Sequence, residues 1–128
     1  MVSVETHQKI DQRLCGRPLS TGPGTSRIEM ETTAEMIVDA SGLVHGGFIF
    51  GLADHAAMLA VNHPNVVLGA AEVKFLKPVK SGERVMAEAR VESGSDRKKI
   101  VAVTVTKGAE TVFTGTLTCF VLDRHVLA

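Results

Sequence analysis

The sequence has no tryptophan and no tyrosine, and its five phenylalanines are the only aromatic residues, 4% of a 128-residue chain. It also lacks an excess of either charge, because 14 basic residues balance 14 acidic ones. The electrostatic pattern of a protein that binds nucleic acid or an anionic membrane surface is therefore missing. We expect neither partner.

Long hydrophobic runs are missing as well. No stretch reaches the roughly 18 apolar residues of a membrane span, and the N-terminus lacks the basic start and apolar run of an export signal. Cysteine is scarce: Cys15 and Cys119 lie far apart, without a C-x-x-C or metal-type spacing. This usage favours reduced thiols in a cytoplasmic protein, and we expect both cysteines to be buried spectators.

What the sequence does contain is an ordinary globular composition, 45% apolar and 22% charged, interrupted by one unusual stretch. From Phe48 to Val61 only Asp54 and His55 are markedly polar. A helix that is apolar on nearly all sides is a buried helix. The Asp54 carboxylate must therefore find specific partners or have an altered pKa.

The spacing places Asp54 on a defined face of this helix. At about 100° per residue, Gly47, Gly51, Asp54 and Met58 lie near one another, whereas His55 is rotated away. Asp54 lies two turns, or roughly 10 Å, along the face that begins at Gly47.

The predicted start of the helix is Gly46-Gly47. Unpaired N–H groups and the positive end of the helix dipole collect there, and glycines let a ligand approach the main chain. A carbonyl oxygen bound at this end would be polarised as in an oxyanion hole, and a carboxylate farther along could act as base or nucleophile. The pair indicates acyl-transfer chemistry.

The remaining patterns predict mostly strands. Residues 4–14 have the spacing of a short amphipathic helix, followed by a Pro/Gly segment; we interpret 1–24 as an appendage and 25–128 as the main domain. Period-two alternation predicts one long, bulged strand at 26–38. Segments rich in Val, Thr and Phe, separated by turns typical of antiparallel hairpins, predict four more strands. These lie at 66–79, 84–92, 100–106 and 111–122.

This order predicts an α+β fold in which one antiparallel sheet curls around one long helix. Open sheet edges and an incompletely covered helix favour at least a homodimer.

The residues that carry a family resemblance are Val44-His45-Gly46-Gly47-Phe-Ile-Phe-Gly-Leu-Ala-Asp54, followed by Val73-Lys-Phe-Leu-Lys-Pro-Val79. Over about residues 25–122, the chain resembles the hot-dog fold acyl-CoA thioesterases of the phenylacetate-pathway type.

The resemblance implies a hot-dog homodimer with a continuous sheet, dimers paired into a homotetramer, an acyl-CoA substrate, and no metal or cofactor. It implies that the Gly47 N–H polarises the thioester carbonyl and that Asp54, from the opposite subunit, activates water or attacks directly. His45 is implied to shape the turn before the helix and to contact the substrate. We count it with Gly47 and Asp54 as a candidate catalytic residue, and a purely structural bond to backbone is the alternative. Substrate contacts are further expected from Asp39, Gly46, Met58, Arg97, Lys98 and Lys99.

Two departures from the family keep alternatives open. Asp39 stands where relatives often have an amide, and an ionised carboxylate cannot donate a hydrogen bond. The start of the strand after the helix, Val66-Val67-Leu68-Gly69-Ala70-Ala71, carries no hydroxyl to orient water. A non-enzymatic sensor of acyl-CoA or acyl carrier on the same fold is one alternative, and a hydratase or dehydratase is another.

Two further interpretations compete with these site assignments. The Arg97-Lys98-Lys99 run, predicted on a hairpin turn, is a solvated turn in the plainer interpretation. A metal site from His45, Asp54, His55 and His63 would require these four side chains to meet at one point, and the helical geometry opposes this. The acyl group is not specified, although the methionines suggest an adaptable apolar pocket.

Overall fold

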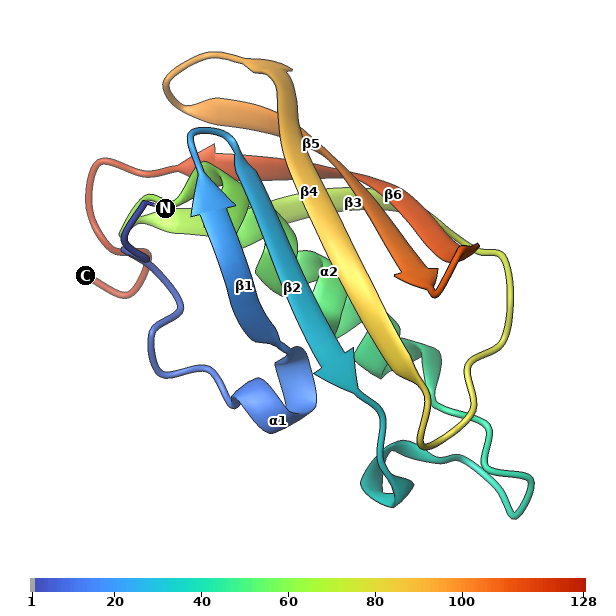
Figure 1. Cartoon of the computed structure of the whole chain (residues 1–128). Helices are drawn as coiled ribbons and strands as arrows, with labels where there is room; N and C mark the ends of the chain where they lie inside the picture. Colours follow the sequence, from blue (N-terminus) through green and yellow to red (C-terminus); the bar gives the residue numbers. More distant parts are fainter. Residues whose placement is uncertain (1) are drawn as a thin grey trace.

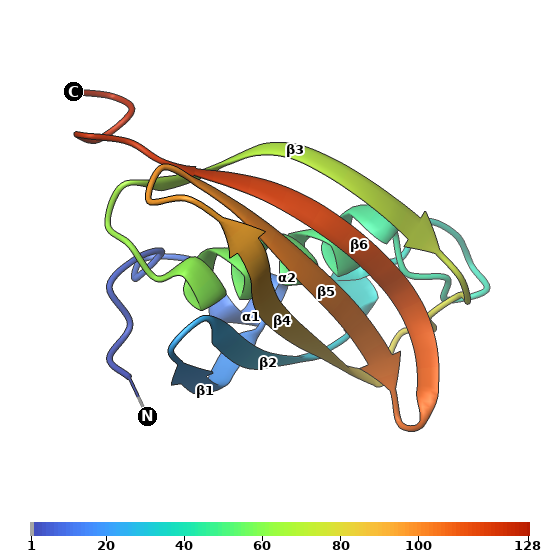
Figure 2. The ribbon, with the colours of Figure 1, turned by 90° about the horizontal axis from the view of Figure 1, so that it is seen from above.

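The computed structural model describes residues 2–128. A six-stranded antiparallel sheet, ordered β1-β2-β4-β5-β6-β3, curls around the long helix α2 (Figures 1 and 2). The predicted α+β arrangement of one sheet wrapped around one helix is confirmed. The strands are β1 (Arg17–Gly22), β2 (Thr25–Glu31), β3 (Val66–Phe75), β4 (Arg84–Gly94), β5 (Lys98–Lys107) and β6 (Glu110–Val121). The helices are α1 (Gln12–Cys15), the 3-10 helix η1 (Ala34–Met36) and α2 (Gly46–Val61).

Helix α2 occupies the span that the apolar run predicts. It ends where Asn62 adopts a left-handed φ of 55°, and the Asn62 N–H closes the last turn on Met58 O. Proline at 64 also disfavours helix in the preceding residue. None of the helices within residues 2–128 is long and apolar enough to cross a membrane.

The core lies between α2 and the concave face of the sheet. Leu52, Ala56 and Leu59 of α2 are fully buried, as are Val101 and Phe113 of the sheet. The opposite face of the helix is less covered. Gly47 is exposed, and Phe50, Gly51, Asp54 and Val61 are only partly buried. One protomer therefore leaves a strip of α2 open along the face that carries Asp54.

Three local predictions are wrong. The helix predicted at 4–14 is confined to Gln12–Cys15, and the residues before it form no helix and turn at residues 8–9. Residues 17–22 form β1, so the proposed boundary at 24/25 falls in the β1–β2 hairpin, and this part of the appendage belongs to the sheet. The long strand predicted at 26–38 ends at Glu31, after which the chain turns through η1.

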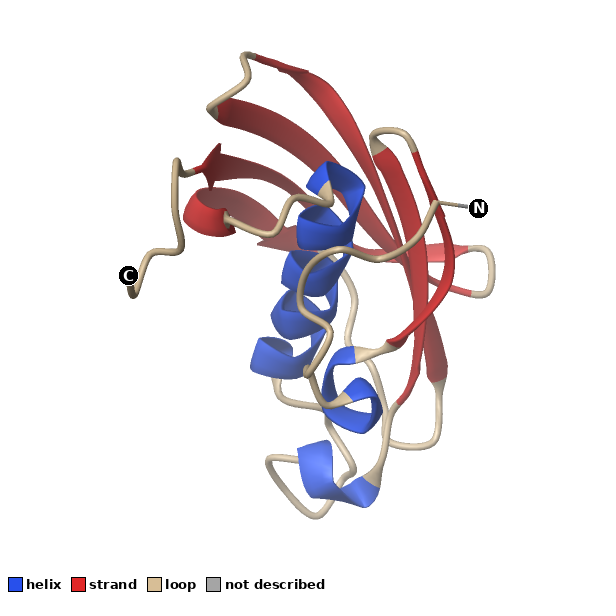
Figure 3. Ribbon diagram, turned by 90° about the vertical axis from the view of Figure 1, so that its left-hand side faces the viewer, coloured by secondary structure: helices blue, strands red, loops and turns tan. Residues whose placement is uncertain are grey.

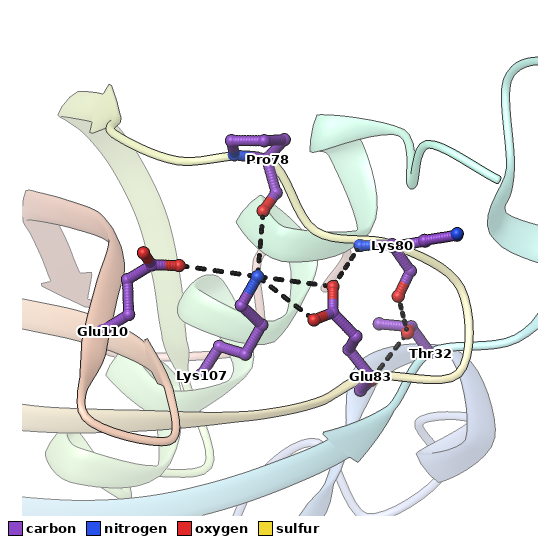
Figure 4. Close-up of polar contacts among 6 residues, drawn as sticks. All are labelled: Thr32, Pro78, Lys80, Glu83, Lys107 and Glu110. Carbon is purple, nitrogen blue, oxygen red and sulfur yellow. Dashed lines mark hydrogen bonds and ion pairs between the residues drawn. The ribbon is translucent and has the colours of Figure 1, made fainter. Parts of the chain in front are cut away.

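The side chains of Lys107, at the end of β5, and Thr32, just after β2, hold the connection between β3 and β4 against the sheet (Figure 4). The Lys107 ammonium lies 3.2 Å from Glu83 Oε2, and Glu83 Oε1 accepts a hydrogen bond from Lys80 N at 2.6 Å. From the end of β2, the buried Thr32 hydroxyl lies within bonding distance of Lys80 O and Glu83 O, at 3.0 and 2.6 Å. These bonds fix the connection beside the start of α2.

Candidate active site

The start of α2 is built around His45. This residue caps the helix: His45 Nδ1 accepts a hydrogen bond from Gly47 N at 2.7 Å, and His45 O accepts one from Phe48 N at 3.0 Å. Within residues 2–128, no hydrogen bond to the Gly46 N–H is found. The donor expected at Gly47 is therefore already paired, and Gly46 carries the free N–H at the positive end of the helix.

The neighbouring main chain holds this cap in place. His45 N donates to Met36 O, and Val44 N donates to Val79 O, both at 2.9 Å. The turn before the helix is thus tied to η1 on one side and to the β3–β4 connection on the other. This geometry supports the structural interpretation of His45, as a residue that shapes the turn.

An apolar hollow of about 300 Å³ opens beside Gly46. Phe75 and Leu76, at and just after the end of β3, line it with 54% and 46% of their surfaces exposed. A Cβ on Gly46 would lie 3.2 Å from the Phe75 ring, so the absence of a side chain keeps the main chain open at this point. An apolar group could therefore lie next to the free N–H.

Asp54 lies in the middle of α2 on its open face. Its Oδ1 is buried and has no hydrogen-bond partner among residues 2–128. Burial raises the pKa of Asp54 above its usual range, and the nearby His7 lowers it in part. A desolvated, incompletely bonded carboxylate is a stronger base than one in water.

The two ends of this candidate site are far apart within one chain. Gly46 and Asp54 are eight residues apart, which corresponds to roughly 12 Å along a helix axis at 1.5 Å per residue. Reacting atoms in a productive complex lie only about 3–3.5 Å apart. One protomer therefore holds both chemical groups but cannot apply both to the same bond.

Comparison with known proteins identifies the family. The model of the thioesterase superfamily matches residues 41–114, which include the cap, α2 and most of the sheet. The chain belongs to the thioesterase superfamily. Among solved structures, an uncharacterized protein from Pyrococcus horikoshii is 50% identical, with a TM-score of 0.98 and 99% and 98% of the two chains covered. A mutant of the phenylacetic acid degradation protein PaaI from Thermus thermophilus is 32% identical, with a TM-score of 0.78 and 85% and 95% covered.

Curated relatives of this thioesterase-superfamily chain are longer proteins. A protein named methylthioribose-1-phosphate isomerase from Aquifex aeolicus (strain VF5) is 48% identical over 123 residues, which are 95% of this chain but 27% of that protein. The transcription factor FapR from Shouchella clausii (strain KSM-K16) is 38% identical over 82 residues, 63% of this chain and 42% of that protein. The chain thus spans less than half the length of each.

Other residues expected at the candidate site lie elsewhere or have other partners. The exposed Asp39 accepts hydrogen bonds from the hydroxyl and the N–H of Ser41, and these bonds lower its pKa. Met58 is 1% exposed and packs in the core. His55, which the helical geometry turns away from Asp54, is 2% exposed and donates from Nδ1 to Cys15 O at 3.0 Å.

The basic run lies at the opposite end of α2 from Gly46. Arg97 lies in the β4–β5 turn, where it forms an ion pair with Asp123 at 2.6 Å. Arg97 and Lys99 line a hollow of about 730 Å³ beside His63. Lys98, at the start of β5, is not among the lining residues. The structure thus keeps this positive charge away from the start of α2 in the same chain.

The cysteines form no disulfide. Burial, and secondarily Asp54, raises the pKa of the Cys119 thiol to about 12, so this thiol stays protonated at neutral pH. Burial also raises the pKa of Cys15, with smaller effects from Asp11 and Asp54. Within residues 2–128, no three His, Cys, Asp or Glu side chains are grouped as metal ligands would be.

Two features of the site were missed from the sequence. The Phe75 ring against Gly46 joins residues from separate elements, and only the F-L-x-P motif gave a signal for that segment. The sequence gave no signal for His7, which affects the pKa of Asp54. In the predicted helix at 4–14, His7 was only one position on an amphipathic surface.

Proposed function

We propose that the protein hydrolyses acyl-CoA thioesters to a free acid and CoA. The N–H of Gly46 polarises the thioester carbonyl. The N–H of Gly47 adds a second hydrogen bond when the His45 side chain rotates away from it. Asp54 accepts a proton from water as the water oxygen bonds to the carbonyl carbon. The carbon–sulfur bond then breaks, and the proton passes from Asp54 to the departing CoA thiolate. The observation that carries the proposal is the desolvated, unpaired Asp54 oxygen on the open face of α2.

The reaction requires two copies of the chain. Because Gly46 and Asp54 of one helix are roughly 12 Å apart, the carbonyl held at Gly46 meets the Asp54 of a second protomer whose α2 runs antiparallel. The open strip of α2 supports this arrangement. A homodimer then contains two equivalent sites, as expected for a closed two-fold assembly. Pairing of dimers into a tetramer stays a prediction.

The rest of the substrate has a place in this proposal. The apolar hollow of about 300 Å³ beside Gly46 suits an apolar portion of the thioester. The basic run with Arg97 and Lys99 remains the candidate for the CoA phosphates, supplied by a neighbouring protomer if not by the same one. Within residues 2–128 of one protomer, Lys98, Asp39 and Met58 make no contact that supports a role at the thioester.

Thiol release across a panel of acyl-CoAs tests the proposal. Asp54→Asn is expected to keep the fold while lowering turnover by at least about 100-fold, the scale for loss of a positioned base. Gly46→Pro removes the free N–H. The backbone accepts the change, because proline is tolerated at the first helical position and His45, with φ −60° and ψ 130°, has a conformation suited to the residue before proline. We expect a loss of roughly 100-fold or more in turnover, as for other oxyanion donors.

Gly46→Ala is the matched control for Gly46→Pro. It adds a Cβ against the same Phe75 ring but keeps the N–H. Equal losses in the alanine and proline variants would attribute the effect to crowding rather than to the missing donor. Unchanged hydrolysis by Asp54→Asn would end the assignment of the base.

A specific observation favours a second candidate, a non-catalytic acyl-CoA-binding protein. The Gly47 N–H is already bonded to His45, and proteins named transcription factor FapR match this chain over part of their length. Such a protein would bind acyl-CoA and melt at a higher temperature by mass action, yet release no thiol. Measuring the melting temperature and thiol release in the same samples separates the two functions.

A further inference from the structure

The connection between β3 and β4 (residues 76–83) is bonded to the turn that leads into α2. In Figure 3 the helix begins at the lower end of the molecule, where η1 and the long loops gather. Two main-chain hydrogen bonds join the connection to this turn: Val44 N donates to Val79 O, and Ser81 N donates to Gly42 O, both at 2.9 Å. The position of the connection therefore affects the position of the helix start.

The same connection lines the apolar hollow beside Gly46. Pro78 and Val79 are among its lining residues, together with Phe75 and Leu76. A shift of the connection would change both the shape of the hollow and the place of the main chain that carries the free N–H of Gly46. Such shifts matter for a reaction, because a misplacement of about 1 Å can lower a rate about 100-fold.

Lys107, at the end of β5, supports the connection from the side of the sheet (Figure 4). Its Nζ lies 3.5 Å from Pro78 O, 3.2 Å from Glu83 Oε2 and 3.4 Å from Glu110 Oε1. Proline has no N–H to donate, and within residues 2–128 no other hydrogen bond to the Pro78 carbonyl is found. Lys107 is thus the group that holds the connection at the residue before Val79.

Thr32 holds a different part of the connection. Its hydroxyl lies close to Lys80 O and Glu83 O, at the end that leads into β4. Lys107 reaches the other end as well, through Pro78 O. The hydrogen bond to Glu83 raises the pKa of Lys107 above its usual value, and burial opposes this effect in part, so the ammonium is charged at neutral pH.

We propose that Lys107 is a positioning residue for the N–H of Gly46. Its ammonium fixes Pro78 and Glu83, which keeps the connection and the turn bonded to it in the place from which that N–H polarises the carbonyl. The role rests on the proposed hydrolysis. Among the described residues, Lys107 is not one of those that line the hollow, so it acts through the connection and not by contact with substrate.

Thiol-release kinetics test this role with matched variants. Lys107→Met nearly keeps the length of the side chain and removes the ammonium. We expect kcat to fall roughly 10-fold or more while KM changes less, because the lost contact acts on the geometry of the transition state. Lys107→Arg restores the charge and is expected to recover most of the turnover. Arg84→Met is the control, since it removes a 3.5 Å ion pair with Glu31 that does not involve the connection, and it leaves kcat unchanged.

The same substitution in a Gly46→Pro background separates positioning from a general loss of stability. A residue that acts only through the N–H of Gly46 has little effect once that N–H is gone. Lys107→Met is therefore expected to lower the residual turnover of Gly46→Pro by less than about twofold, whereas independent effects would multiply.

Hydrogen exchange gives a readout that needs no turnover. In Lys107→Met the amides of Val44 and Ser81, which bond across the two joined segments, are expected to exchange faster. The amide of Val103, in the middle of β5, keeps its wild-type rate. Glu83→Gln removes the charge of the partner carboxylate and is a second variant expected to change the same amides.

Unchanged kcat and unchanged exchange in Lys107→Met and Glu83→Gln overturn the proposal. Equal losses of turnover in Lys107→Met and Lys107→Arg also overturn it, as does full multiplication of the losses in the Gly46→Pro background. If the wild type releases no thiol while exchange at Val44 and Ser81 responds to Lys107→Met but not to Arg84→Met, the proposed hydrolysis fails and the support of the connection by Lys107 stands.

Discussion

At the scale of single residues, Asp54 is a group that the fold tolerates at a cost. Burial raises its pKa in the folded protein above the ordinary 3.8, whereas the unfolded chain ionises near that ordinary value. Between the two pKa values the unfolded state gives up its proton first, so the stability of the fold falls as pH rises through this window. Above the pKa of Asp54 in the folded protein, the full cost of the ionised carboxylate is present.

Asp54→Asn is therefore expected to raise the melting temperature at pH 7 while it lowers turnover by at least about 100-fold. A gain of about 1 kcal/mol would correspond to roughly 3–6 °C for a domain of this size. The gain shrinks as pH falls from the raised pKa of Asp54 in the folded protein toward the ordinary pKa of aspartate, because wild-type Asp54 is then protonated too. Thermal melts of both proteins from about pH 3 to about pH 8 measure this difference. Asp96→Asn, at an exposed turn position, serves as control, and a gain that did not depend on pH would contradict the explanation.

At the scale of elements, the β3–β4 connection depends on the buried end of β2. Thr32 is 2% exposed. Its hydroxyl lies within hydrogen-bonding distance of the carbonyl oxygens of Lys80 and Glu83, which lie in the connection outside the sheet. Its N–H also donates to Glu83 O, and Gly82 N donates to Thr32 O. One residue therefore ties the end of β2 to the connection that carries Val79 to the start of α2.

Thr32→Val keeps the size of the side chain and removes the hydroxyl. We expect a loss of about 1–2 kcal/mol in the free energy of unfolding, the usual cost of depriving a buried group of its partner. Hydrogen exchange should accelerate at the Gly82 amide and at the amides of the connection, but not in the β4–β5 turn. Thr32→Ser, which restores the hydroxyl, is the matched control. Equal exchange in the valine and serine variants would show that the hydroxyl does not hold the connection.

The elements predicted well from sequence are those whose ends carry local chemical signals. Helix α2 begins at a glycine pair and ends before Pro64, and β4, β5 and β6 are separated by polar turns. Strand β1 was missed because Pro18 and the glycines around it indicated a break, although an edge strand tolerates proline. The end of β2 was missed because the bonds that stop it at Thr32 come from residues about 50 positions away.

In the candidate site, too, only the features set by local sequence could be predicted. The places of Gly46 and Asp54 along one helix follow from helical spacing, which is a local property. The pairing of the Gly47 N–H with His45 and the position of the Phe75 ring against Gly46 depend on side-chain directions or on contacts between distant segments. No periodicity in the sequence records these contacts.

At the scale of the whole molecule, the site is expected to be shared between protomers. Both outer strands of the sheet, β1 and β3, have an open edge in one protomer, and α2 leaves the face of Asp54 uncovered. Exposed edges and apolar strips are commonly covered by a second copy. If the second copy places its Gly46 opposite Asp54, each inactive variant lacks a different half of every site.

Mixing Asp54→Asn with Gly46→Pro therefore restores activity that neither variant has alone. Random reassortment of two equally abundant chains makes about half of the dimers mixed, and each mixed dimer has one site with both groups intact, so about a quarter of wild-type activity is expected for a two-fold dimer. The chains are unfolded together, refolded and assayed for thiol release, with light scattering to confirm the dimer. Each variant refolded alone is the control. A mixture that stayed as inactive as its components would place Gly46 and Asp54 of a working site in the same chain, which the roughly 12 Å between them along α2 argues against.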